Sequence, residues 1–218
     1  MSGVPSTMSK LILSILLAAS AALAQYKTEP AGAPPSELAP AISQTLGTQG
    51  TKIIGGDGKV FCEVWFRTSI PSGPAPQAAD QTITLSGVPH GALLGAIRFP
   101  GQGADRRGQT IKPGVYTLRY SLQPVNGDHQ GVSPQRDFVV MVPAADDKDV
   151  NALPAFDPLM AMSRKASGTP HPAVLSIWAA AASDPVPSFA KQGDSDWVLT
   201  VKIGSTAVSI ILVGAAQG

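Results

Sequence analysis

The C-terminal stretch WVLTVKIGSTAVSIILV, residues 197–213, decides the fold class. Alternate residues of its first half share one face of a strand: Trp197, Leu199, Val201 and Ile203. Gly204-Ser205 then supplies a two-residue turn, and a glycine at the first turn position favours a type II′ hairpin. The apolar run after it is far shorter than the roughly 20 residues that cross a bilayer, which favours a buried strand. The stretch therefore predicts a β-hairpin with one face in a core.

A second hairpin is predicted between residues 52 and 67. Residues 52–54 and 59–67 flank the turn Gly55-Gly56-Asp57-Gly58 and alternate with period two. The apolar face of the longer strand comprises Val60, Cys62, Val64 and Phe66. Cys62 is the only cysteine, so no intramolecular disulfide can form, and we expect a buried, unreactive thiol.

Short strands recur through the rest of the chain, each bounded by Gly, Pro, Asn or Asp. They are predicted at residues 81–85, 93–99, 115–123, 137–142 and 173–178. The 218 residues include 20 prolines and 22 glycines, which keep the strands short. This pattern predicts an all-β fold, an antiparallel β-sandwich of the immunoglobulin-like or jelly-roll-like kind, with one or two short helices.

Two segments interrupt the strand pattern. Asp157 as a cap, Pro158 at the first helical position and Gly168 as a stop predict one helix. Its apolar face carries Leu159, Met162 and Ala166. A shorter helix is predicted within residues 36–46, although Pro40 disfavours it.

The N-terminal segment is typical of export. Lys10, the apolar run from residue 11 to 19 and the triplet Ala22-Leu23-Ala24 follow the order of a signal peptide, so residues 1–24 are predicted to be removed. Residues 25–35 are rich in Pro and small residues and are expected to form a tether. Residues 36–218 are then expected to form a single β-sandwich domain.

The charge balance excludes several partners. Without Lys10 the chain carries 15 basic and 15 acidic residues and no long run of one sign. This argues against nucleic acid or an anionic membrane as the main partner. We expect a soluble protein with no membrane span after cleavage, in the periplasm or outside the cell.

Candidate binding groups gather in and after the loop NGDHQG, residues 126–131. Asp128 and His129 place a carboxylate beside an imidazole, and Arg136 and Asp137 follow at the next predicted strand. A hairpin turn requires only Asn-Gly, so the additional groups point to binding. The alternative, which we favour, is that Arg136 and Asp137 tie the turn down.

His171 lies between two prolines, in a stiff segment that holds the imidazole in one direction. This suits a structural hydrogen bond to a neighbouring loop, and it also suits a binding site. We favour the hydrogen bond and keep His171 as a candidate.

Catalytic and metal signals are weak. His90, His129 and His171 have no paired spacing, and no metal or cofactor is predicted. Asp146, Asp147 and Asp149 lack the pattern of a calcium loop and are expected in a solvated turn. No G-x-S-x-G elbow occurs, so no catalytic residue is assigned.

Exposed aromatic residues would indicate a carbohydrate-binding surface. Trp65 lies on the strand face opposite Cys62, where it would pair with Phe61. If that face meets solvent, Trp65 is a candidate for stacking on a sugar ring. If a second layer covers it, both aromatics belong to the core, as strand aromatics usually do.

The run KPGVYTLRY, residues 112–120, resembles the Pro-Gly turn and Tyr-Thr-Leu strand of secreted immunoglobulin-like modules. Over more of its length the chain is similar to exported bacterial β-sandwich proteins that have no assigned activity. The resemblance implies export and a β fold, and it implies no chemistry.

Strong fold signals and weak catalytic signals favour an exported, non-enzymatic protein that binds a ligand, an envelope protein or a carbohydrate. Two alternatives remain open. One is a hydrolase-like or metal-assisted enzyme centred on Asp128, His129 and His171, which would need these side chains within about 10 Å of one another to share a proton or a metal. The other is a structural component of the envelope.

Cleavage after Ala24 makes Gln25 the first residue of the mature protein. Intact-mass measurement or N-terminal sequencing of secreted material checks this. Retention of Met1 in a cytoplasmic pool would contradict export.

Overall fold

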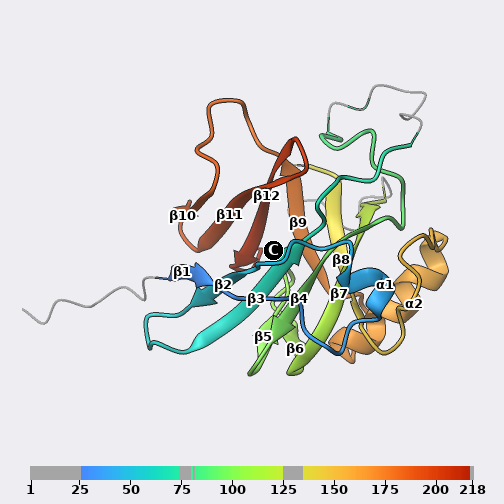
Figure 1. Ribbon diagram of the computed structural model, residues 1–218, viewed down its shortest axis with the longest axis horizontal. Helices are drawn as coiled ribbons and strands as arrows, with labels where there is room; N and C mark the ends of the chain where they lie inside the picture. Colours follow the sequence, from blue (N-terminus) through green and yellow to red (C-terminus); the bar gives the residue numbers. More distant parts are fainter. Residues whose placement is uncertain (1–25, 74–79, 81, 125–134, 217–218) are drawn as a thin grey trace, which may run out of the picture.

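The structure is a computed structural model that describes residues 26–73, 80, 82–124 and 135–216. Within these residues ten strands form one antiparallel sheet in the order β1-β2-β3-β4-β7-β8-β9-β12-β11-β10 (Figure 1). The strands are β1 (Lys27–Pro30), β2 (Thr51–Ile54), β3 (Val60–Phe66), β4 (Leu93–Phe99), β7 (Gly114–Leu122), β8 (Asp137–Pro143), β9 (Val174–Ala179), β10 (Ser188–Gln192), β11 (Asp196–Ile203) and β12 (Thr206–Val213). A small hairpin of β5 (Gly103–Ala104) and β6 (Thr110–Ile111) stands apart.

Strand β9 joins the two halves of the large sheet. Its first residues, 174–176, pair with β8, and its last residues, 177–179, pair with β12. The sheet therefore turns at β9, and its two halves enclose one apolar core. Side chains from both halves are buried there, among them Cys62, Ile97, Leu118, Val139, Leu199 and Ile210.

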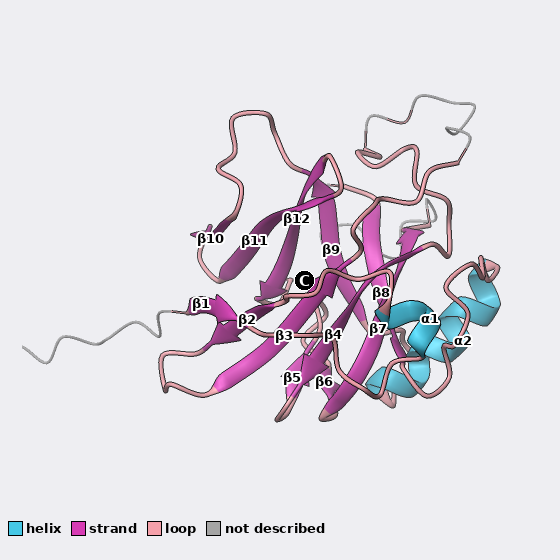
Figure 2. Cartoon of the chain, in the orientation of Figure 1, coloured by secondary structure: helices cyan, strands magenta, loops and turns pink. Residues whose placement is uncertain are grey.

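Two helices cover the outside of the sheet in the described part of the chain (Figure 2). Helix α2 (Phe156–Ser167) packs Leu159 and Met160 against Val140 and Val142 of β8. Helix α1 (Pro40–Ser43) begins at a proline, which needs no partner for a missing N–H in the first turn. It buries Ile42 against Trp65 and Leu93.

The predicted antiparallel all-β fold with few helices is confirmed. Both predicted hairpins form, from β2 and β3 and from β11 and β12, and Gly204 has a φ of 63° in the second turn. Helix α2 ends as predicted, with Gly168 left-handed at a φ of 66°. Its N-cap, however, is Ala155, and Asp157 lies in the first turn.

Two predicted segments differ from the structure. Residues 27–30, expected within a tether, form strand β1 and pair with β2. Residues 82–85, expected in a strand, form none, and their backbone N–H groups at Thr84 and Leu85 donate instead to the Asp137 carboxylate. Strand β10 was not predicted. The predicted signal peptide, residues 1–24, lies outside the described residues.

Neither helix in the described ranges has the length and apolar character that crossing a membrane requires.

Cys62 is fully buried on the core face of β3, as predicted. Burial, together with the neighbouring Glu63, raises the pKa of its thiol, so the reactive thiolate is disfavoured. A thiol reagent should therefore label Cys62 only through opening of the fold, on the order of a thousandfold more slowly than in the unfolded chain. Labelling with a chromogenic disulfide in buffer and in urea measures this ratio, and equal rates would contradict the burial.

Candidate functional site

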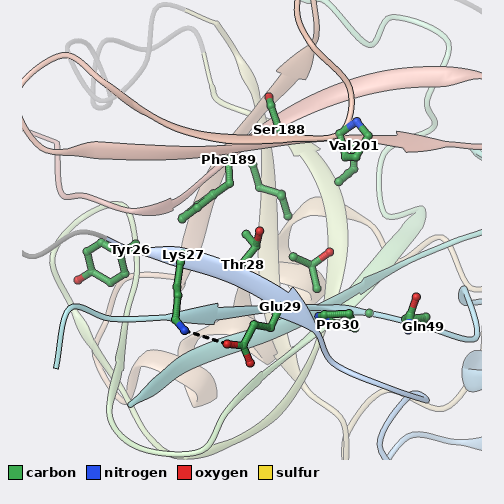
Figure 3. Close-up of a pocket in the computed structure, with 13 residues that line it drawn as sticks. Tyr26, Lys27, Thr28, Glu29, Pro30, Gln49, Ser188, Phe189 and Val201 are labelled. Carbon is green, nitrogen blue, oxygen red and sulfur yellow. Dashed lines mark hydrogen bonds and ion pairs between the residues drawn. The ribbon is translucent and has the colours of Figure 1, made fainter. Parts of the chain in front are cut away.

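The two end strands of the sheet, β1 and β10, border a groove of about 640 Å³ (Figure 3). We name it the edge groove; it is lined by residues 26–30, 49–51 and 187–189 together with Leu199 and Val201. Successive strand residues point to opposite faces, so a strand that lines a cavity with one face contributes every second residue. Both 26–30 and 187–189 are consecutive. The edges of the strands, with their backbone groups, therefore face the groove.

The groove combines apolar and uncharged polar surfaces. Phe189 and Val201 point from β10 and β11 towards β1 (Figure 3). Polar groups come from the hydroxyls of Thr28 and Thr51 and from the amide of Gln49, whereas the Ser188 side chain points away from β1 (Figure 3). This lining suits a ligand that has both apolar and hydrogen-bonding parts.

Among the described residues that line the edge groove two are charged, and they pair with each other. Lys27 Nζ lies 2.9 Å from Glu29 Oε1, and both side chains point away from β10 (Figure 3). The hydrogen bond from Lys27 lowers the pKa of the Glu29 carboxyl. The groove thus presents no unpaired charge to a ligand.

A row of aromatic rings closes one end of the groove. Trp197 of β11 contacts Phe189 with ring centres 5.4 Å apart and Tyr26 with ring centres 5.5 Å apart. Tyr26 contacts Phe61 at 6.0 Å, and Phe61 contacts Phe99 at 5.8 Å. The row therefore ties β10 and β11 to β3 and β4 across the groove. Partial burial, with Asp57 nearby, raises the pKa of the Tyr26 hydroxyl.

The residues predicted as binding groups lie elsewhere. Asp128 and His129 fall outside the described residues. Arg136 donates to the Gln123 carbonyl over 2.9 Å and to Asp80 over 2.6 Å. These contacts tie together the segments that flank the predicted loop, which is the structural role that the sequence left open.

Asp137 is fully buried at the start of β8 and accepts four hydrogen bonds. The donors are the N–H and hydroxyl of Thr84, the N–H of Leu85 and the hydroxyl of Tyr120, at 2.7 to 3.0 Å. Asp137 thus holds the segment 82–85 onto the sheet. Its carboxylate is engaged by the protein and has no exposed surface for a ligand.

The structure does not bring His171 together with Arg136 and Asp137. The Met141 N–H donates to the Ala173 carbonyl, so Ala173 lies beside Met141, four residues along β8 from Asp137. His171 lies farther still from Asp137, because β8 and β9 are antiparallel. At about 3.3 Å per residue, the backbones of His171 and Asp137 are therefore about 13 Å or more apart. The His171 side chain is exposed, and its backbone is held locally: its N–H donates to the Thr169 hydroxyl, and its carbonyl accepts from the Ser167 hydroxyl.

Trp65 is buried, with 1% of its surface exposed, beneath helix α1. Its indole N–H donates to the Gly32 carbonyl over 2.8 Å, and the close approach of Gly50 leaves no room for a ligand. Phe61 does not share this environment. The register of β2 and β3 shifts between Ile53 and Ile54, which turns Phe61 towards the main core. Trp65 is therefore a core residue and is not available for stacking on a sugar.

The described residues contain no group of three or more His, Cys, Asp and Glu that could hold a metal ion. Asp147, expected in a solvated turn, is buried instead and binds Arg119. Arg119 donates to both Asp147 oxygens, at 2.6 and 2.7 Å, and to the carbonyls of Gly91, Asp149 and Ala152. These contacts of Arg119 all lie within the protein, and the pair of Arg119 and Asp147 anchors the loop that precedes α2.

Comparisons with family models, curated proteins and solved structures found no match to this chain. The candidate site therefore rests on geometry alone. Sequence reasoning missed the edge groove, because most of its residues come from segments assigned to a tether or left unassigned, while Leu199 and Val201 were assigned to the core face of a hairpin. One signal was present: Tyr26 and Phe189 are aromatic residues in segments that were given no place in the core.

Asp137→Ala should destabilise the fold by about 3 kcal/mol, because it leaves four donors, two of them buried and two partly buried, without their acceptor. Tyr120→Phe removes one of these donors and should cost about 1 kcal/mol. Urea unfolding measures both. An unchanged unfolding midpoint in the Asp137 variant would show that the carboxylate is not structural.

Proposed function

We propose that this protein is an exported, non-enzymatic binding protein whose ligand lies in the edge groove. The observation that carries the proposal is the pair of strand edges that face the groove across an apolar floor. Backbone groups at an unpaired edge require hydrogen-bond partners, which water or a ligand can supply. A ligand that replaces the water gains these bonds together with the contact to Phe189, Leu199 and Val201.

The lining supports binding more than catalysis. A general acid or base, or an activated nucleophile, requires a titratable group within hydrogen-bond reach of another one. Lys27 and Glu29 form such a pair, but it lies on the exposed outer face of β1. The groove side of β1 carries the Thr28 hydroxyl, which has no base beside it among the described lining residues.

Export is supported by the sequence alone. The order of Lys10, an apolar run and Ala22-Leu23-Ala24 precedes β1 almost directly. Cleavage after Ala24 would leave Tyr26, the ring that links the two sheet edges, as the second residue of the mature chain.

Val201→Trp should abolish ligand binding, because the larger side chain fills the groove from β11. Lys202→Trp is the matched control: it adds the same ring to the neighbouring exposed position on the opposite face of the strand. The panel of ligands comprises neutral oligosaccharides and capped uncharged peptides, tested by thermal unfolding. A ligand at 100 times its Kd should raise the Tm of the wild type and of the control by about 5 °C or more.

The Val201 variant should show no such rise while Cys62 stays protected from labelling, which establishes that the variant is folded. Equal stabilisation of the Val201 variant would place the ligand elsewhere. A panel in which nothing stabilises the wild type would contradict a binding function for the groove.

A further inference from the structure

We infer that the edge groove binds an extended, uncharged peptide segment that adds to β1 as a further strand. The inference rests on the proposed function and names the class of its ligand. A peptide is distinguished from other neutral ligands by its regular backbone donors and acceptors. The backbone of β1 shows which of its groups are available.

The direction of the β1 backbone follows from one hydrogen bond. Ala31 N–H donates to the Gly50 carbonyl over 2.9 Å, so the N–H of Ala31 points towards the segment that leads into β2. The direction of the backbone N–H and C=O groups alternates along an antiparallel strand, so the backbone groups of Lys27 and Glu29 also point towards β2. The backbone groups of Thr28 and Pro30, the residues in between, point the other way, into the edge groove.

The free edge of β1 therefore offers the N–H and C=O of Thr28 and the C=O of Pro30. Pro30 has no N–H, so an incoming strand finds a single donor followed by two acceptors. The short length of β1, its charged pair and Pro30 are features that limit indiscriminate pairing of edge strands. The edge is thus open to one extended segment in one register.

The other wall determines the side chains of that segment. Thr28 pairs with the buried Ile53, and Phe189 pairs with Leu199, so the side chains of Thr28 and Phe189 lie on the same side of the sheet as the main core, where Thr28 is exposed to the groove. A peptide residue that faces inward would contact the apolar surface of Phe189 and Leu199. The described residues on the interior side of the groove carry no charge, so a charged residue there would lose its hydration without gaining a partner. Inward positions of the ligand are therefore apolar or small, and neutral.

The test uses random seven-residue peptides displayed on phage, selected on the wild-type protein and counter-selected on the Val201→Trp variant. Enriched sequences are synthesised with capped ends and measured by calorimetry. Thr28→Pro removes the outward N–H, whereas Thr28→Val keeps the N–H and removes the hydroxyl. The Pro variant should bind about tenfold more weakly, and the Val variant within about threefold of the wild type.

A second arm requires no change in the protein. Two versions of the peptide are compared, one methylated at the odd backbone nitrogens and one at the even ones. Because successive N–H groups of a strand point to opposite sides, one version should bind at least tenfold more weakly and the other should lose less. This arm decides the question where the Thr28→Pro variant does not fold.

The outcomes separate the two proposals. Equal losses in the Pro and Val variants would assign recognition to the hydroxyl and overturn strand addition. If selection enriches no peptide while an oligosaccharide stabilises the wild type and not the Val201 variant, the peptide inference fails and the proposed function stands. If neither class of ligand binds, both fail.

Discussion

A row of aromatic contacts connects the two ends of the sheet, which no backbone pairing joins among the described strands. It runs through Phe189, Trp197, Tyr26, Phe61 and Phe99. Ten strands are connected by hydrogen bonds from β1 to β10, but no pairing joins β10 back to β1 among the described strands. Ring contacts of this kind, edge-to-face except for the tilted pair of Phe189 and Trp197, each contribute on the order of 1 kcal/mol beyond the area they bury. They hold β1 and β10 near each other at one end of the gap between these strands, which we call the seam. The rest of the seam is the edge groove.

Buried polar groups fix the parts that surround this core. Asp137 holds the segment 82–85 against the sheet, and Arg119 with Asp147 holds the loop that precedes α2. A buried charge is tolerated only when its hydrogen-bonding capacity is met, and both carboxylates meet that condition within the protein. Their burial makes them determinants of the fold. By contrast, the polar groups of the edge groove keep their capacity for a ligand.

The local parts of the fold could be predicted from the sequence, and the non-local parts could not. Hairpins such as β11 and β12 were predicted because their alternation and turn residues are adjacent in the chain. Strand β1 was missed because Pro30 and its neighbours read as a tether, and only pairing with β2, some 25 residues later, makes the segment a strand. Asp147 was misjudged for the same reason, since its partner Arg119 is 28 residues away.

The environment of Trp65 shows a different limit. Alternation along β3 placed Trp65 and Phe61 on one face, but the shift in register opposite Ile53 and Ile54 sends the two rings to different clusters. One extra residue in a strand reverses every later assignment of face, and sequence alone does not reveal it. The same shift brings Phe61 into the aromatic row, so the irregularity helps to close the sheet.

The edge groove exists because the sheet order begins and ends at strands that meet in space, a property of topology that no single segment encodes. Closing the seam with hydrogen bonds would satisfy both edges and remove the groove. Leaving it open keeps the outward groups of Thr28 and Pro30 in contact with water. A paired edge gains only about 1 kcal/mol for each hydrogen bond, because water already satisfies these groups. The open seam therefore costs little stability, while the aromatic row keeps the two edges in place for a ligand.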